Sequence, residues 1–96
     1  MTKKVLIAGF TGAMGQKAVN LVNQMAGYEV AAGLSPVAKN EPEKYHLAKN
    51  IPIFTSLEQI PDRVADFWID FTTPKAVYEN VKFALTHHIC PIVGTT

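Results

Sequence analysis

The chain has 96 residues, of which 48% are hydrophobic, and a formal net charge of +1. This length suffices for one compact core and excludes a second sizeable domain. Lysine and arginine are scattered along the chain, so no basic stripe is available to neutralise a nucleic-acid backbone, and we do not expect a nucleic-acid partner.

The start of the chain runs directly into a strand pattern and shows no signal-peptide pattern. Its longest apolar stretches are far shorter than the ~20 residues that span a bilayer. We therefore expect no membrane association and a cytoplasmic location. The single cysteine, Cys90, agrees with a reducing compartment, and its place beside Pro91 at the start of an apolar run favours a packing role.

The first part of the chain predicts a strand, a glycine-rich turn and a helix. Residues Lys4 to Ala8 form an apolar run without alternation, which is typical of a parallel strand covered on both faces. Helical spacing begins at Ala13, and Gly27 is a stop signal. The expected inward stripe of this helix consists of Met14, Ala18, Leu21, Val22 and Met25.

The glycines between this strand and helix are typical of a phosphate-binding turn. A nucleotide pyrophosphate needs backbone N–H groups at close range and the positive end of a helix dipole behind them. Gly9 permits a tight first turn, Gly12 a close backbone approach and Gly15 close helix packing. In the commonest dinucleotide fingerprint the third and sixth positions are also glycine, whereas here they are Thr11 and Met14. An ordinary glycine-rich turn that binds nothing is the alternative.

The middle of the chain predicts two further strands and a long loop. Residues Glu29 to Leu34 are expected to form a strand, and the polar segment 35–50 a surface loop with a short helical turn. Residues 51–54 predict a short strand. Ser56 then begins a brief helix through a capping box with Gln59, and Pro61 limits its length.

The last third predicts a strand, a helix and a final strand. Ala65 to Asp70 is the expected strand, and Thr73 opens the helix with a hydroxyl cap followed by Pro74 in the first turn. The expected inward stripe of this helix consists of Val77, Val81, Ala84, Leu85 and His88. Residues 91–93 predict the last strand.

Strands that alternate with helices at this spacing imply right-handed crossovers and a parallel sheet. We therefore predict an α/β fold, a Rossmann-type parallel sheet with helices on both faces and strand order 3-2-1-4-5, in one domain over residues 1–96. In such sheets ligands bind outside the carboxyl ends of the strands, beside the first strand.

Three segments fall on that edge of the predicted sheet. The glycine turn follows the first strand, the segment 70–74 follows the fourth, and the segment 93–96 follows the fifth. For Thr73 and Pro74 helix capping and a ligand role both remain open, and Asp70 could cap backbone groups in its own turn. Gly94 could supply a flat slot for a nicotinamide carboxamide, and Thr95 its hydrogen bonds.

In order and spacing these segments resemble the amino-terminal domain of the dihydrodipicolinate reductase family of bacterial lysine biosynthesis. The resemblance covers the whole chain and rests on Ile7-Ala8-Gly9, Gly12-Ala13-Met14-Gly15, Asp70-Phe71-Thr72-Thr73-Pro74 and Val93-Gly94-Thr95-Thr96. It implies hydride transfer from NAD(P)H to the cyclic product of dihydrodipicolinate synthase, giving tetrahydrodipicolinate in the diaminopimelate route, by a homo-tetramer. The residues implied in cofactor binding are Gly9, Phe10, Thr11, Gly12, Ala13, Met14, Gly15, Phe71, Thr72, Thr73, Gly94, Thr95 and Thr96.

Two departures from the family pattern bear on the cofactor. Ala13 stands where family members often carry arginine, and Leu34-Ser35-Pro36 offers no acidic residue at the end of the second strand. Without a carboxylate there, a ribose 2′-phosphate is not repelled. We therefore predict a preference for NADPH or use of both NADPH and NADH, with Ser35 and Lys39 near the phosphate. The alternative for Lys39 is a solvated loop charge.

The family's substrate domain, with its histidine pair and lysine, has no counterpart before Thr96. We therefore expect residues 1–96 to be a fragment that binds cofactor without turning over substrate, its catalytic residues lying beyond Thr96. His87 and His88 lack the surrounding family motif and are interpreted as structural. No third ligand stands at a plausible spacing from them, so no metal site is expected.

Two other functions remain open. One is a stand-alone nucleotide-sensing Rossmann module that is complete at this length. The other is a different glycine-loop NAD(P) dehydrogenase, either an extended short-chain dehydrogenase or a semialdehyde dehydrogenase. Tyr45 and Lys49 match the tyrosine–lysine spacing of the former but lie in a proline-bearing loop, and Cys90 comes too early for the nucleophile of the latter.

Overall fold

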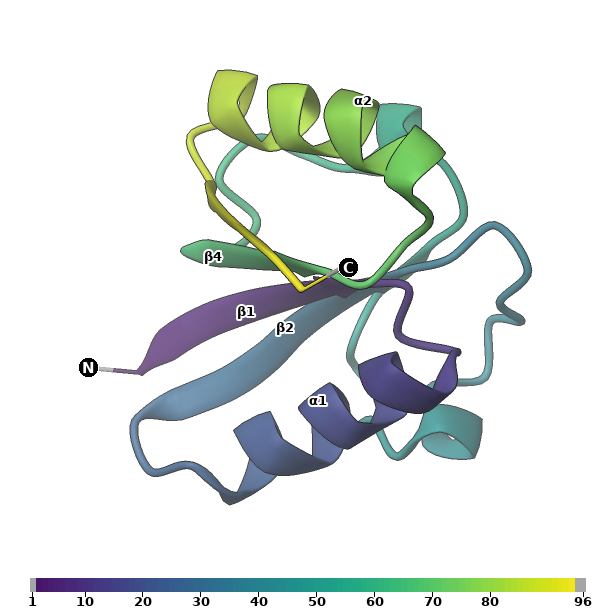
Figure 1. The fold of residues 1–96 in the computed structure, drawn as a ribbon. Helices are drawn as coiled ribbons and strands as arrows, with labels where there is room; N and C mark the ends of the chain where they lie inside the picture. Colours follow the sequence, from purple (N-terminus) through teal and green to yellow (C-terminus); the bar gives the residue numbers. More distant parts are fainter. Residues whose placement is uncertain (1, 95–96) are drawn as a thin grey trace.

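The computed structural model describes residues 2–94. Its strands form one parallel five-stranded sheet in the order β3-β2-β1-β4-β5, with α1 and α2 on opposite faces (Figure 1). The elements are β1 (Lys3–Ala8), α1 (Ala13–Gln24), β2 (Tyr28–Leu34), β3 (Ile53–Phe54), β4 (Phe67–Asp70), α2 (Pro74–Thr86), β5 (Cys90–Val93) and the short 3-10 helices η1 (Pro42–Tyr45) and η2 (Leu57–Gln59). The predicted fold class and strand order are confirmed.

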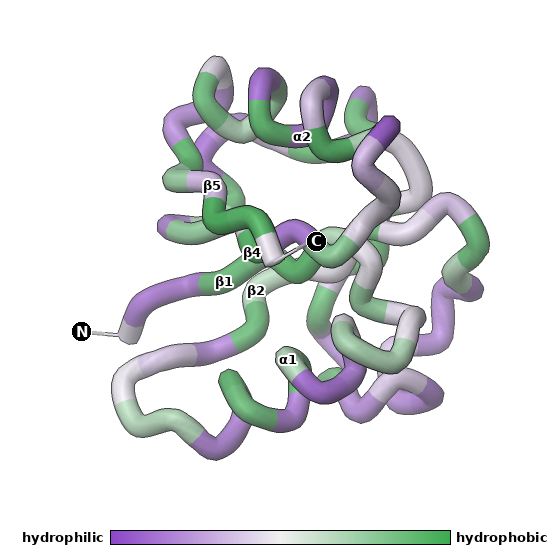
Figure 2. Tube along the Cα trace, viewed as in Figure 1, coloured by the Kyte–Doolittle hydropathy of each residue, from purple (hydrophilic) through white to green (hydrophobic). Residues whose placement is uncertain are grey.

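Strand β1 lies at the centre of the sheet and supplies both layers of the core. Leu6 and Ala8 pack in the cluster on the α2 side, whereas Val5 and Ile7 pack in the cluster on the α1 side. All four side chains are buried, which explains why the strand shows no polar alternation. Figure 2 shows this hydrophobic half of β1 running through the middle of the molecule.

The expected inward stripe of α1 is only partly right: Val22 is buried and Ala18 packs half-buried against the core as predicted, but the other three expected members are exposed. Gly15, Val19 and Val22 are the buried residues of this helix. Gly15 determines the phase, because a Cβ there would lie 2.0 Å from the Gly9 carbonyl oxygen and only a glycine lets the helix pack so closely on the turn. The exposed members of the expected stripe are Met14, Leu21 and Met25.

The expected stripe of α2 is also only partly right. Ala84 is buried as predicted, but Leu85 is exposed and His88 lies beyond the helix. Asn80, which the expected stripe leaves out, is buried, and its amide is hydrogen-bonded to Asp70. The remaining expected members, Val77 and Val81, are half-buried.

Several local predictions need correction. The predicted capping box is absent: the Gln59 side chain accepts a hydrogen bond from the Thr55 amide, 2.7 Å away, and not from Ser56. Cys90 is exposed, not packed. Cys90 lies on the edge strand β5, which pairs only with β4. Helix α1 packs on β1 and β2, so within the described residues no helix covers the face of β5 opposite α2. The short helical turn predicted in the long loop is present as η1.

Within residues 2–94 no helix is both long enough and apolar enough to cross a membrane.

Candidate functional site

Three chain segments meet at the carboxyl edge of the sheet, where β1, β4 and β5 end side by side. Backbone hydrogen bonds join them to neighbouring strand ends. The Gly9 amide donates to the Leu34 carbonyl at 2.8 Å, and the Phe71 amide to the Ala8 carbonyl at 2.9 Å. The Gly94 amide donates to the Asp70 carbonyl at 2.8 Å. The edge is therefore a continuous, well-supported rim.

A crevice of about 430 Å³ opens along this rim. Its lining residues are Gly9, Thr11, Gly12, Leu34, Pro36, Thr55, Ser56, Leu57, Phe71, Thr72, Thr73, Ala76 and Asn80. None of these side chains carries a charge. The lining side chains offer a ligand only hydroxyl, amide and apolar groups, and backbone dipoles add to these.

The glycines of the turn are required for different reasons. Gly9 has a φ of +80°, and a Cβ there would lie 3.0 Å from the backbone of Phe71, so both conformation and space favour glycine. Gly15 is required by its contact with Gly9. A Cβ at Gly12, by contrast, would meet only the Gly9 oxygen at 3.7 Å, an ordinary contact. The protein itself therefore does not require glycine at position 12, and the open space there is available to a ligand.

The amino terminus of α1 opens beside Gly12. Gly12 is the N-cap residue and has no side chain to cap the helix, and the first turn contains no acidic residue. The first-turn amides of a helix have no intrahelical partner, and the helix dipole adds partial positive charge at the same point. A glycine turn with free amides behind it is a suitable site for a phosphate group.

The loop after β4 provides the opposite wall. Thr73 is the N-cap residue of α2 but makes no side-chain capping hydrogen bond, and Pro74 opens the helix as predicted. Asp70 does cap its own turn, as the sequence suggested, because its Oδ1 accepts the Thr72 amide at 2.8 Å. A Cβ on Gly94 would lie 2.4 Å from the Phe71 ring, so this glycine packs flat against that ring.

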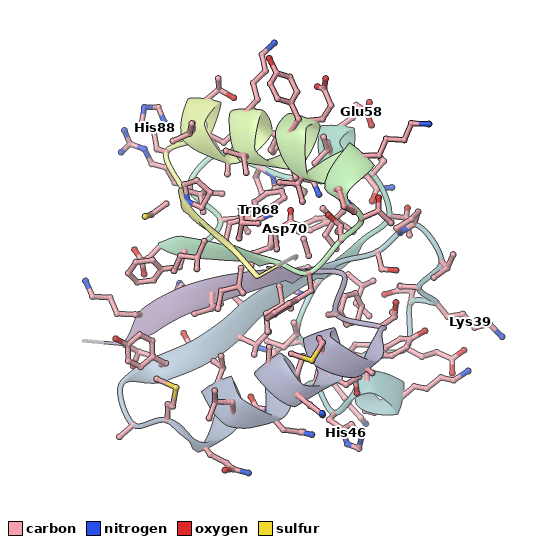
Figure 3. The ribbon with its side chains drawn as sticks, viewed as in Figure 1. Lys39, His46, Glu58, Trp68, Asp70 and His88 are labelled. Carbon is pink, nitrogen blue, oxygen red and sulfur yellow. The ribbon has the colours of Figure 1, made fainter. Side chains whose placement is uncertain are left out.

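Some of the predicted site residues lie elsewhere. Phe10 is fully buried beneath the turn, edge-on to Tyr45 at 5.1 Å. Ser35 is buried, and its hydroxyl is hydrogen-bonded to that of Thr11 at 3.0 Å. Lys39 is exposed and extends outward from the surface (Figure 3). Two more, Ala13 and Met14, are exposed at the start of α1 and do not line the crevice. Thr95 and Thr96 lie outside the described residues.

Sequence reasoning missed several lining residues. Leu34 and Pro36 flank the end of β2, and Thr55–Leu57 follow β3. The rule that ligands bind at the carboxyl ends of parallel strands applies to β3 as well and would have indicated the second group. Ala76 and Asn80 line the crevice from α2, and no signal in the sequence marks them.

The histidines are engaged in local contacts. His87 stacks on Phe83, with ring centres 3.7 Å apart, and His88 lies 3.4 Å from the Asp62 carboxylate. Neither lines the crevice. Among residues 2–94 no group of His, Cys, Asp and Glu side chains could hold a metal ion.

A parallel sheet with a glycine turn and a helix amino terminus at its carboxyl edge defines a nucleotide-binding α/β domain of the Rossmann type. Residues 3–96 match the family model described as dihydrodipicolinate reductase, N-terminus, and the chain belongs to this family.

Similar proteins agree with this assignment. The chain is 74% identical to 4-hydroxy-tetrahydrodipicolinate reductase of Lactobacillus helveticus, over the whole chain and 37% of that protein. Among solved structures it resembles dipicolinate-bound dihydrodipicolinate reductase from Paenisporosarcina sp. TG-14, with a TM-score of 0.77 and 31% sequence identity. The match covers the whole of this chain and 38% of the Paenisporosarcina chain. An oxidoreductase from Agrobacterium radiobacter in complex with NAD+, L-tartaric acid and magnesium shares the fold, with a TM-score of 0.77 and 15% identity over 97% of this chain and 27% of that one. The chain thus spans little more than a third of the curated relatives that it matches.

Proposed function

We propose that this chain is the cofactor-binding part of a 4-hydroxy-tetrahydrodipicolinate reductase and that its crevice holds NADPH or NADH. The observation that carries this proposal is the glycine turn, whose Gly12 leaves free space beside the amino terminus of α1. The cofactor's pyrophosphate fits there, because backbone amides and the helix dipole favour an anion. Family membership and the NAD+ bound by the Agrobacterium oxidoreductase of the same fold support the choice of a dinucleotide.

The crevice accepts both dinucleotides in this proposal. Its adenosine end lies between Pro36 at the end of β2 and the segment 55–57 after β3. A carboxylate at the end of the second strand would bind the ribose hydroxyls of NADH and repel the 2′-phosphate of NADPH. Leu34 and Pro36 provide no carboxylate, and the Ser35 hydroxyl is directed to Thr11, so no lining residue at this end opposes the extra phosphate.

The reaction itself is assigned to the whole reductase. A bound reduced nicotinamide supplies a hydride, and the remaining chain of the longer relatives supplies substrate binding and a proton. Within this chain, the residues around the crevice bind and orient the cofactor: the glycine turn receives the pyrophosphate, and Phe71 with Gly94 forms a flat surface towards β5. Hydride transfer needs the reacting carbons about 3 to 3.5 Å apart, a geometry that depends on the substrate-binding part.

Titration of the chain with NADPH and with NADH, followed by cofactor fluorescence, tests the proposal. We expect saturable binding of one dinucleotide per chain, with NADPH bound at least as tightly as NADH. Addition of substrate produced by dihydrodipicolinate synthase should cause no NADPH oxidation. Binding of NADH much tighter than that of NADPH contradicts the account of the adenosine end, and appreciable turnover contradicts the assignment of catalysis to the rest of the reductase.

A further inference from the structure

The most buried charged side chain of the described residues is the Asp70 carboxylate, which lies behind the crevice wall and does not line it. It is fully buried between the sheet and α2, beside Trp68 (Figure 3). One oxygen, Oδ2, accepts the Trp68 indole N–H at 3.2 Å and the Asn80 amide at 2.9 Å. The other, Oδ1, accepts both the amide and the hydroxyl of Thr72. Burial of a carboxylate costs free energy unless hydrogen bonds replace its lost water, and these donors provide that replacement.

Asn80 connects this carboxylate to α2. Its side-chain amino group donates to Asp70 and also lies 3.3 Å from the Thr72 hydroxyl oxygen. Because a carboxylate accepts hydrogen bonds and donates none, it determines which end of the Asn80 amide faces it. Asn80 and Thr72 both line the crevice, so the network joins strand, loop and helix directly behind the ligand-facing surface.

The position of Phe71 depends on the same turn. Phe71 follows Asp70 directly, and its backbone lies where a Cβ on Gly9 would come within 3.0 Å. Its ring fills the space above Gly94. A displacement of the turn that begins at Asp70 would therefore press Phe71 into the glycine turn or move it off Gly94, and either change alters the shape of the crevice.

We propose that Asp70 and Asn80 are positioning residues of the cofactor crevice, which act through Thr72 and Phe71 and touch no reacting atom. This inference rests on the proposed function, because its readout is dinucleotide binding. A carboxylate that only stabilised the core would make cofactor affinity insensitive to Asn80 as long as the domain stayed folded.

The test measures the Kd of NADPH for the chain and for three variants. Asn80→Ala removes the donor, and Asn80→Asp keeps the size but places a second carboxylate against Asp70. Asn20→Ala, at an exposed position of α1, is the matched control. Trp68 is the only tryptophan, so its indole N–H resonance reports on the Asp70 hydrogen bond in every variant.

We expect Asn80→Ala to weaken NADPH binding by about tenfold while the indole resonance keeps a folded position. Asn80→Asp should bind more weakly still, because two adjacent carboxylates repel each other. Asn20→Ala should leave NADPH binding unchanged. Binding by a folded Asn80→Ala chain within about twofold of the original overturns the inference. If the unsubstituted chain binds neither dinucleotide, the proposed function fails, and this inference fails with it.

Discussion

At the scale of single residues, the glycines of the turn separate requirements of the fold from requirements of the ligand. Gly9 and Gly15 are fixed by protein atoms, since a Cβ on either meets backbone at 3.0 Å or less. Gly12 meets no such obstacle. The contacts of Gly9 and Gly15 agree with the tight turn and the close helix packing that the sequence analysis expected of them, whereas the space beside Gly12 is open.

Alanine substitutions should separate these requirements. Gly15→Ala should destabilise the domain by about 1–3 kcal/mol, because its Cβ overlaps the Gly9 carbonyl and the helix must move. Gly12→Ala should leave the melting temperature within a few degrees of the original, yet weaken NADPH binding by about tenfold or more. Thermal unfolding and cofactor titration of both variants make the comparison. A Gly12→Ala chain that binds normally would show that the pyrophosphate does not approach this residue.

Residue-level prediction from the sequence succeeded where backbone position decided the outcome. Gly9, Gly12 and Thr72 reach the crevice because they follow strands whose carboxyl ends share one edge. It failed where side-chain direction decided. Ser35 was expected near the cofactor phosphate, but it is buried and its hydroxyl is hydrogen-bonded to that of Thr11. Asn80 is polar and reads as an outward residue, because the pattern contains no sign of its buried acceptor.

At the scale of elements, the helices show why hydrophobic spacing identifies a helix more reliably than its buried face. The apolar residues of α1 occupy a wider face of the helix than the face that contacts the sheet. Hydrophobic spacing alone is therefore compatible with either of two adjacent buried faces. Contact with the glycine turn at Gly15 selects the stripe that contains Val19 and Val22. That contact is tertiary and cannot be deduced from the periodicity of the helix.

This correction predicts an order of stability that is opposite to the sequence pattern. Val19→Ala should lower the free energy of unfolding by about 1–3 kcal/mol, because Val19 is completely buried. Leu21→Ala should change it by no more than about 0.5 kcal/mol, because Leu21 is 59% exposed. Urea unfolding of the two variants measures the difference. A larger loss for Leu21→Ala would mean that the stripe inferred from the sequence is the buried one in solution.

At the scale of the whole molecule, the fold was predictable because alternating strands and helices leave few topologies. Right-handed crossovers and the turn signals were sufficient for the strand order 3-2-1-4-5. Strand β3 is shorter than the predicted residues 51–54, because an edge strand has few partners to extend its hydrogen bonding, whereas the brief helix predicted from Ser56 is present as η2. The position of the crevice followed from topology, but its neutral lining became evident only in three dimensions.

The central claim is that the crevice at the carboxyl edge of the sheet binds a dinucleotide. Titration of the 15N-labelled chain with NADPH, followed by the backbone amide resonances, tests it most directly. The account predicts the largest shifts at residues 9–15 and 71–73, smaller ones at 55–57, and none at His46, which is exposed outside the crevice (Figure 3). Saturable binding with shifts confined to residues away from this edge, or no shifts at all, would contradict it.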